Sequence, residues 1–348
     1  MFAAESRTVV VPVHKASETL AAWKHIAEPI EPFLEAVSLR LGKQVREFDP
    51  AIFPYAEYAL TGQGKQLRPA LVAMSAEAVG KLNDSHITVA VIIEMVHLAT
   101  LVHDDVMDEA EIRRGRLTLG ANWGNEIAVL FGDCLFAQAL KLAASFPTPE
   151  ICRAVAMATN TVCSGEILQT QQRRNFQFSE DEYFKVLEMK TAELFALSCD
   201  LGACLCGAAT LQRSALRGFG VALGTAYQLY DDCLDLFGSE AMAGKSLGTD
   251  LAKGKLTLPV LRFWRRGGSA EKERLQAMVQ NWQPQCIGAV LELLGKHEAL
   301  AESLEIIHQY LRQARECLRA LPETANHAGL TRLTEYLARQ TDSLGACA

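Results

Sequence analysis

The chain has 348 residues, 49% of them hydrophobic, and carries a formal net charge of −7. It is long enough to bury a large core, and its acidic balance gives no support for nucleic acid as a partner. Residues 1–15 lack the basic and apolar regions of a secretory signal, and polar residues such as Glu94 and His97 interrupt the longest apolar stretches. We therefore expect a cytoplasmic protein with no membrane-spanning segment.

Helical periodicity dominates the chain, and strand-like alternation is nearly absent. Phe33, Val37 and Leu41 form an apolar stripe typical of an amphipathic helix. Thr148-Pro149 and the capping box Ser179–Glu182 indicate two further helix starts. Breaks between helices are expected at residues 50–64, 111–119, 146–147, 238–254 and 265–269.

None of these breaks is a long low-complexity linker. We therefore predict a single all-α domain, a bundle of ten or more helices, over residues 30–348. An N-terminal extension over residues 1–29 would precede it.

The first candidate binding element is a basic loop at residues 64–69, with the sequence Gly-Lys-Gln-Leu-Arg-Pro. It precedes a stretch expected to be helical over residues 70–79. Backbone N–H groups at the start of a helix, together with Lys65 and Arg68, can bind a phosphate. An exposed basic turn without a ligand is the alternative.

Two acidic clusters share one pattern, DDxxD, and lie far apart in the chain. The first consists of Asp104, Asp105 and Asp108, and the second of Asp231, Asp232 and Asp235. On a helix these positions share one face, where like charges repel by about 0.2–0.5 kcal/mol per pair. Apolar residues precede both clusters, so buried carboxylates needing a cation are favoured over a solvated helix face. Mg²⁺ with phosphate oxygens completing its shell is the expected partner.

Other polar side chains accompany the clusters. His97 lies seven residues before Asp104 on the same helical stripe, where a satisfied core histidine is the alternative to a ligand role. Arginine suits bidentate phosphate contacts, and Arg113-Arg114 closely follows the first cluster. The remaining basic elements are Lys190-Thr191, Lys245 and Lys255.

Residues 248–256 superficially resemble a P-loop. Five residues rather than four separate the glycines, Leu256 replaces the required Ser or Thr, and no strand leads into the segment. A P-loop kinase is therefore not expected.

Over roughly residues 30–340 the chain resembles the trans-isoprenyl diphosphate synthases, or polyprenyl synthetases, and especially their long-chain members. The motifs that carry the resemblance are Gly64-Lys65-xx-Arg68-Pro69, Glu94-xx-His97, Asp104-Asp105-xx-Asp108, Arg113-Arg114-Gly115, Gly165-Glu166-xx-Gln169, Lys190-Thr191-Ala192, Tyr227-Gln228-xx-Asp231-Asp232-xx-Asp235 and Gly244-Lys245-xx-Gly248-Thr249-Asp250-Leu251-xx-Gly254-Lys255. Two positions depart from the family pattern. Gln66 stands where arginine is common, and Leu117 stands where proline often follows the paired arginines.

The resemblance implies helices around a deep central cavity with both aspartate clusters on its upper walls. It implies that three Mg²⁺ ions, bridged by diphosphate, are held directly by Asp104, Asp108 and Asp231. Asp105, Asp232 and Asp235, with Asp250, would support the metals indirectly. The implied reaction is head-to-tail condensation of isopentenyl diphosphate with an allylic diphosphate through an allylic carbocation, with the departing diphosphate as proton acceptor.

The same resemblance assigns roles to the other polar residues. Isopentenyl diphosphate would be held by Lys65, Arg68, His97 and Arg114. The allylic diphosphate would be held by Arg113, Lys190, Lys245 and Lys255. The residues expected to act in catalysis are Asp104, Asp108, Lys190, Asp231, and the oxygen dipoles of Thr191 and Gln228.

Product length is expected to depend on Ala99 and Thr100, which lie about one helical turn below Asp104. Short-chain members of the family close the channel with aromatic residues at these positions, and neither residue here is bulky. The next candidates for a channel floor are Val96, Ile93 and Ile92. We therefore expect a product longer than geranylgeranyl, in the hexaprenyl to octaprenyl range.

Several alternatives remain at this point. A geranylgeranyl or farnesyl diphosphate synthase differs only in product length. A class I terpene cyclase is less favoured, because the second cluster is all aspartate and Lys65 and Arg68 provide for a second diphosphate. A non-catalytic partner subunit is less favoured, because no metal ligand has been lost. We expect a homodimer that delivers its product to a membrane.

Overall fold

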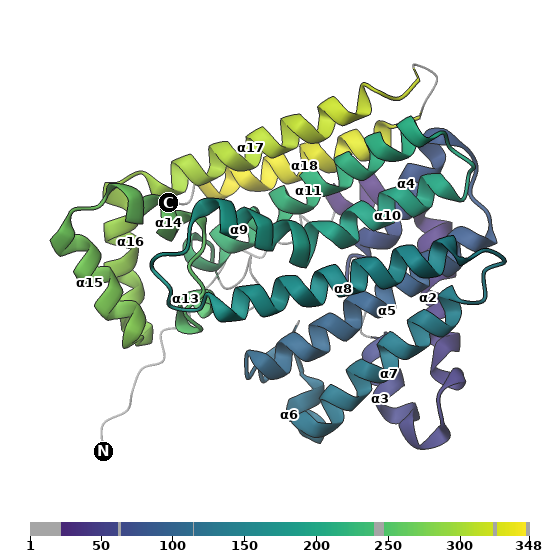
Figure 1. The fold of residues 1–348 in the computed structure, drawn as a ribbon, viewed down its shortest axis with the longest axis horizontal. Helices are drawn as coiled ribbons and strands as arrows, with labels where there is room; N and C mark the ends of the chain where they lie inside the picture. Colours follow the sequence, from purple (N-terminus) through teal and green to yellow (C-terminus); the bar gives the residue numbers. More distant parts are fainter. Residues whose placement is uncertain (1–21, 62–63, 114, 240–246, 323–325, 346–348) are drawn as a thin grey trace.

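The computed structural model describes residues 22–61, 64–113, 115–239, 247–322 and 326–345 (Figure 1). Within these residues the chain is almost wholly helical, and long helices run alongside one another in stacked layers. The prediction of an all-α fold with ten or more helices is therefore confirmed.

The N-terminal half contains α2 (Glu31–Gln44), α3 (Phe53–Thr61), α4 (Leu67–Val79), α5 (Asp84–Met107), α6 (Leu119–Trp123), α7 (Asn125–Ala143) and α8 (Pro149–Gln171). The C-terminal half contains α9 (Glu180–Leu187), α10 (Glu193–Cys204), α11 (Thr210–Phe237), α13 (Thr249–Ala252), α14 (Leu258–Arg266), α15 (Ser269–Gln280), α16 (Ile287–Lys296), α17 (Ala299–Leu318) and α18 (Ala328–Gly345). The shorter elements are the 3₁₀ helices η1 (Glu28–Ile30), η2 (Val45–Glu47), η3 (Pro50–Ile52) and η5 (Pro284–Cys286), the π-helical turn η4 (Glu188–Ala192), and the antiparallel strands β1 (Ile112–Arg113) and β2 (Arg116–Leu117).

Two glycines allow α10 and α11 to pack closely. A Cβ atom at Gly220 would lie 2.6 Å from the Cα atom of Ala196, and one at Gly224 would lie 2.7 Å from the Cα atom of Ala192. Both distances are too short for a side chain, so glycine is required where the backbones meet. This close packing sets η4, at the start of α10, against the helix that carries the second aspartate cluster.

The region before the basic loop differs from the sequence-based expectation. Residues 50–64 were expected to form a break, yet η3 and α3 lie there, because the Asp49 carboxylate accepts a hydrogen bond from the backbone N–H of Ala51 and α3 buries Ala56 and Leu60. The hydroxyl of Tyr58 on α3 donates to a backbone oxygen of the β1–β2 hairpin at 2.6 Å. The unexpected helix therefore anchors the hairpin that follows the first aspartate cluster.

The packed part of the chain begins before residue 30. Trp23, Ile26 and Ile30 are buried in the core. The predicted boundary between residues 29 and 30 therefore falls within a packed segment.

Helix α5 is long and apolar enough, by length and composition alone, to cross a membrane. Its most apolar 18-residue window has a mean hydropathy of 1.7, and 61% of that window is buried inside the fold. Core helices of globular proteins meet the same criterion. The helix packs against α4 and α7 and carries the first aspartate cluster at its C-terminal end.

Candidate active site

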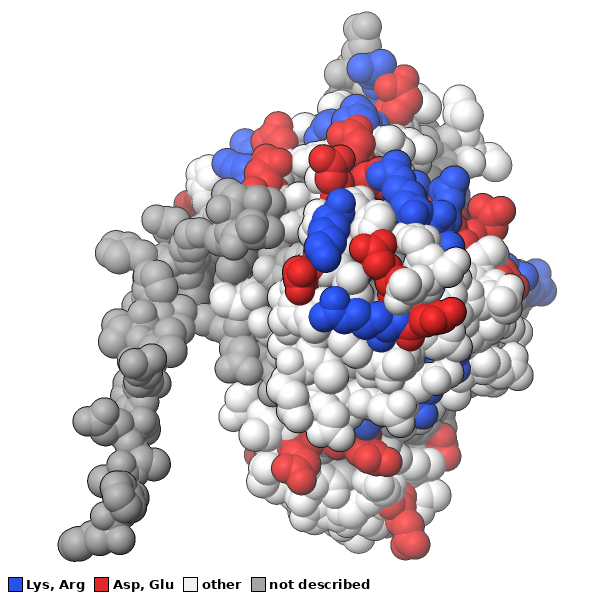
Figure 2. Space-filling model, turned by 90° about the vertical axis from the view of Figure 1, so that its left-hand side faces the viewer, with Lys and Arg blue, Asp and Glu red and all other residues white. Residues whose placement is uncertain are grey.

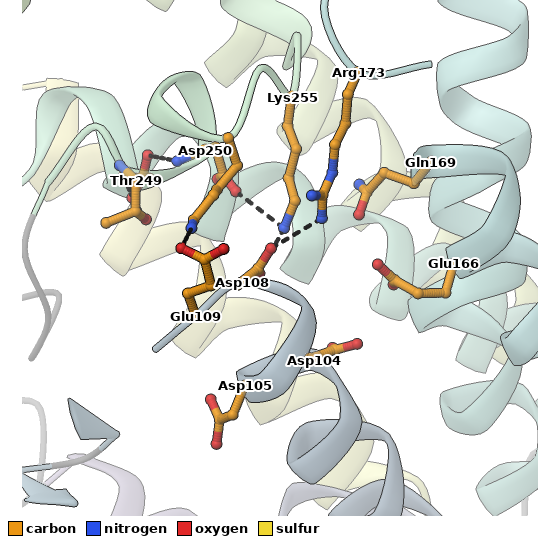
Figure 3. Close-up of polar contacts among 12 residues, drawn as sticks. Asp104, Asp105, Asp108, Glu109, Glu166, Gln169, Arg173, Thr249, Asp250 and Lys255 are labelled. Atoms are coloured by element: carbon orange, nitrogen blue, oxygen red, sulfur yellow. Dashed lines mark hydrogen bonds and ion pairs between the residues drawn. The ribbon is translucent and has the colours of Figure 1, made fainter. Parts of the chain in front are cut away.

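The two aspartate clusters and the loop around α13 meet on the side of the molecule where Figure 1 places α13. Lys255, just after α13, donates to Asp108 at the end of α5 at 2.8 Å (Figure 3). Asp235, near the end of α11, accepts hydrogen bonds from the hydroxyl of Thr249 at 2.7 Å and the N–H of Asp250 at 3.1 Å. Figure 2 looks onto this side and shows acidic and basic side chains close together on the surface. The end of α5 and the distant segment from the end of α11 to the loop after α13 thus form one charged site.

The aspartates of the clusters fall into two groups by exposure. Three are buried, with at most 7% of their surface exposed: Asp105, Asp232 and Asp235. The other three are half-buried and keep part of their surface toward solvent: Asp104, Asp108 and Asp231. The buried members are those expected to support metals indirectly, and the half-buried members are those expected to hold them directly.

The half-buried carboxylates of the first cluster lie among cations. Lys190 lies 3.9 Å from Asp104 and forms an ion pair with Glu166, and it donates to Gln169 at 2.8 Å. Burial, reinforced by the charge of Glu166, raises the pKa of Asp104 to about 6 against the opposing charge of Lys190. Burial also favours the neutral form of Asp108, but Lys255 and the other nearby cations outweigh it and lower the pKa of that carboxyl.

The buried carboxylates are held by protein donors. Arg113 donates to Asp105 at 2.7 Å. Asp232 accepts from the hydroxyl of Tyr183 at 2.5 Å and from the amide of Gln228 at 2.8 Å. Burial, with the charge of Asp250, raises the pKa of Asp232 to about 8 despite these two hydrogen bonds. Through their hydrogen bonds, the carboxyl groups of Asp105, Asp232 and Asp235 hold neighbouring elements in place.

Lys190 and Thr191 belong to η4, a π-helical turn between α9 and α10. Such turns often occur at functional sites because they displace side chains from regular helical positions. Gly165 of α8 packs against the turn: a Cβ atom there would lie 2.8 Å from the backbone nitrogen of Lys190. From the turn, Lys190 reaches the first cluster, and the hydroxyl of Thr191 donates to Gln228 at 2.8 Å beside the second.

The basic loop leads directly into α4, which begins at Leu67 rather than at residue 70 as expected. Gln66 has left-handed backbone angles (φ 49°, ψ 44°), and its buried amide donates to Ser38 at 2.9 Å. Lys65 donates to the hydroxyl of Tyr336 on α18 at 3.0 Å, and the guanidinium of Arg68 stacks 5.0 Å from the ring centre of Phe195. The glutamine that departs from the family pattern thus contributes to the structure of the loop.

Comparisons with known proteins agree with this geometry. A sequence profile described as Polyprenyl synthetase matches residues 49–310. An octaprenyl diphosphate synthase from Haemophilus influenzae is 33% identical over 308 residues, covering 88% of this chain and 94% of the relative. Heptaprenyl diphosphate synthase component 2 from Bacillus subtilis is 33% identical over 311 residues, covering 88% of each. The chain belongs to the polyprenyl synthetase family.

A solved structure supports the same assignment. The crystal structure of a polyprenyl synthase from Caulobacter crescentus, complexed with calcium and isoprenyl diphosphate, matches with a TM-score of 0.83. The sequence identity is 31%, and the match covers 92% of this chain and 97% of the other. The protein is therefore a trans-prenyltransferase with the all-α fold of the isoprenoid synthases, and the predicted family, fold and reaction class are confirmed.

The donors in this polyprenyl synthetase suit Mg²⁺, on which catalysis in the family depends. Mg²⁺ is usually held by one or two carboxylates, with water and substrate phosphates completing its shell. Asp104 and Asp108 lie one turn apart on α5, are half-buried, and offer hard oxygen atoms. Among the described residues, no three His, Cys, Asp or Glu side chains are already grouped closely enough to hold an ion.

The remaining predicted site residues are placed as follows. Arg114 and Lys245 lie outside the described residues. His97 is half-buried on α5, and its backbone oxygen accepts a hydrogen bond from the hydroxyl of Thr100 at 2.7 Å. Ala99 is fully buried.

Two contact residues near the clusters had not been expected at all. Arg173 donates to Asp108 at 3.0 Å, and Tyr183 donates to Asp232. Neither belongs to a motif in the sequence, and only the tertiary fold brings them to the aspartates. Glu166 and Gln169 do belong to a motif, and the structure adds their contact with Lys190.

Proposed function

We propose that this polyprenyl synthetase condenses isopentenyl diphosphate with an allylic diphosphate and makes a polyprenyl diphosphate longer than geranylgeranyl, in the hexaprenyl to octaprenyl range. The observation that carries the proposal is that the loop around α13 joins the two aspartate clusters, while Lys190 and Lys255 lie beside the half-buried carboxylates of the first cluster. The carboxylates can hold metal ions, and the lysine side chains beside them can bind phosphate oxygens. Together they suit a diphosphate bound through metal ions.

In the proposed reaction, Asp104, Asp108 and Asp231 would hold Mg²⁺, three ions per site, whose positive charge would offset the negative charge of the allylic diphosphate. Lys190 and Lys255, with Arg113 and Lys245, bind that diphosphate and favour its departure. The allylic C–O bond breaks and its electron pair leaves with the diphosphate.

The resulting allylic cation is then attacked by the double bond of isopentenyl diphosphate. The oxygen atoms of Thr191 and Gln228 stabilise the cation by their dipoles. Isopentenyl diphosphate is positioned by Lys65, Arg68, His97 and Arg114. The new carbon–carbon bond forms, and the diphosphate takes the proton that is lost, so no side-chain base is required.

The proposed length of the product rests on the side chains of α5 that lie below the first aspartate cluster. Ala99 and Thr100 are small, and the residues below them on the helix, Val96 and Ile93, are buried in the core. The relatives named octaprenyl and heptaprenyl diphosphate synthases support a long product.

We infer further that the enzyme is a cytoplasmic homodimer and that its product passes to a membrane. The name of the Bacillus relative, a component of its synthase, makes a heteromeric assembly the rival possibility. Light scattering of the purified protein, combined with turnover measured without any other subunit, distinguishes the two.

Product analysis tests the proposed reaction directly. Purified protein is incubated with Mg²⁺, isopentenyl diphosphate and farnesyl diphosphate, and the products are measured by mass spectrometry. Polyprenyl diphosphates with at least six isoprene units are expected. Cyclic hydrocarbons would indicate a terpene cyclase, and geranylgeranyl diphosphate alone would contradict the proposed length. No product from the isolated chain would contradict a self-sufficient enzyme.

A further inference from the structure

The carboxylate of Asp108 is engaged by cations on both oxygen atoms. Arg173 donates to Oδ1 at 3.0 Å, and Lys255 donates to Oδ2 at 2.8 Å (Figure 3). Each oxygen keeps a second lone pair, but a metal ion bound there would lie beside two cations and be repelled by them, so metal binding favours release of one of the two. Lys255 already has a proposed role at the allylic diphosphate, whereas Arg173 has none.

Arg173 has binding capacity that the protein leaves unused. Its Nε atom is buried, and it has no hydrogen-bond partner among the residues that the structure describes. A buried donor without an acceptor costs about 1–3 kcal/mol. The guanidinium presents its N–H groups in a fixed planar fork that matches phosphate oxygens. The guanidinium therefore keeps a donor that its contact with Asp108, made through one terminal nitrogen, does not use.

The backbone holds Arg173 in a fixed position next to Lys255. Arg174, the following residue, has left-handed angles (φ 59°), and its N–H donates to the backbone oxygen of Gly254 at 2.7 Å. A Cβ atom at Gly254 would lie 2.5 Å from Cγ of Arg174, so the two turns are in close contact. The end of α8 and the loop after α13 therefore present Arg173 and Lys255 as a matched pair.

We propose that Arg173 is a further substrate-binding residue, which pairs with Asp108 in the free enzyme and transfers to the diphosphate of the allylic substrate when that carboxylate binds metal. The proposal rests on the proposed function of Asp108 as a metal ligand. Arg173 thereby neutralises the acidic cluster before substrate arrives, and it contributes a cation to the diphosphate afterwards. The allylic site would thus include a cation from the end of α8.

Binding of inorganic diphosphate, measured by calorimetry with and without Mg²⁺, tests this proposal independently of turnover. Arg173→Gln should weaken Mg²⁺-dependent diphosphate binding about tenfold, equivalent to about 1.4 kcal/mol. Arg173→Lys should restore part of it, because a lysine keeps the charge but loses the fork. The KM for isopentenyl diphosphate should not change. Arg153→Gln, at an exposed arginine near the other end of α8, is the matched control and should bind diphosphate as the wild type does.

If the ion pair between Arg173 and Asp108 had a purely structural role, removing Arg173 should not weaken diphosphate binding. If Arg173 only restrained Asp108, its removal would free the carboxylate, and Mg²⁺-dependent binding of diphosphate would be unchanged or stronger in Arg173→Gln. That result, with a thermal unfolding curve showing a folded variant, would overturn the proposal while leaving the proposed function intact. Absence of Mg²⁺-dependent diphosphate binding by the wild-type protein would overturn both.

Discussion

Individual aspartates in the two clusters have different surroundings, although the clusters have the same pattern. Asp104 is half-buried beside Lys190, whereas Asp232 is buried and bonded to Tyr183 and Gln228. A sequence pattern shows which residues share a helical face but not which of them a neighbouring helix covers. Chemistry is therefore expected from the half-buried members, and structural support from the buried ones.

Replacement of a half-buried aspartate should remove catalysis without unfolding the protein. In Asp104→Ala or Asp231→Ala, turnover is expected to fall by about two orders of magnitude or more, because charge stabilisation in the transition state is lost. Turnover with isopentenyl and farnesyl diphosphates, and helicity by circular dichroism, are the measurements. Asp342→Ala, at an exposed carboxylate on α18, is the control. Near-normal turnover in either cluster variant would refute the metal assignment.

A buried histidine outside the site makes stability depend on pH. His86 is fully buried between α5 and α10. Its Nδ1 lies 3.1 Å from the backbone nitrogen of Asn83 and 3.0 Å from the Oδ1 of the same residue, and its Nε2 lies 3.1 Å from the backbone oxygen of Gly202. Burial lowers the pKa of His86, although the two backbone hydrogen bonds oppose the shift. Below the ordinary histidine pKa of about 6.5, the unfolded chain therefore binds a proton that the folded protein resists.

The free energy of unfolding is expected to fall as the pH is lowered through 6.5, the ordinary value, and to level off below the folded pKa of His86. Urea denaturation at a series of pH values measures this dependence. His86→Gln should be less stable at neutral pH but should lose less on acidification. His25→Gln, at an exposed histidine, should keep the wild-type pH dependence. Equal slopes in the wild type and in His86→Gln would contradict the assignment.

At the scale of secondary structure, short irregular segments position most of the charged side chains. The π-helical turn η4 carries Lys190, and the turn after α8 carries Arg173. Helix α13 is capped by Asp235 and leads to Lys255. Long helices supply the frame, and these segments direct the cations toward the clusters.

Gly165 should control the position of η4. A Cβ atom at Gly165 would lie 2.8 Å from both the backbone nitrogen of Lys190 and Cβ of Met189, so Gly165→Ala must displace the turn or α8. Turnover is expected to fall further than any loss of folded protein explains, because Lys190 moves relative to Asp104. Gly42→Ala, in open space on α2, is the matched control and should stabilise the protein by about 0.5–1 kcal/mol. Unchanged turnover in Gly165→Ala would mean that η4 accommodates the side chain without moving Lys190.

For the whole molecule, helical periodicity predicted the all-α fold, and the motifs contain most of the charged residues that the structure brings together. They did not predict α3, because it follows directly on η3, which Asp49 and Pro50 begin within a segment rich in turn signals. They also did not predict the contact between Arg173 and Asp108, which joins residues 65 positions apart. Local patterns determine helices, whereas contacts between helix ends depend on how the helices pack. Such contacts leave no local signal in one sequence.

The predicted product length depends on how far the chain can extend beneath the aspartates of α5. Thr100 is half-buried and lies one turn below Asp104, Ala99 is fully buried beside it, and Val96 lies a further turn away. One turn rises about 5.4 Å, comparable to one isoprene unit, so each turn lined by small side chains permits roughly one further addition. A bulky side chain at the first turn should therefore stop elongation early.

Ala99→Phe should shorten the product toward farnesyl or geranylgeranyl diphosphate, because the ring closes the path of the growing tail. Thr100→Phe should act in the same direction, and it enters a less tightly packed position, which guards against an unfolded variant. Leu130→Phe, at a side chain on α7 that is 61% exposed, should leave product length unchanged. Mass spectrometry of products at equal substrate conversion measures the distributions. If the wild-type enzyme alone stops at farnesyl, or if neither aromatic substitution on α5 shifts the distribution, length is controlled elsewhere in the molecule.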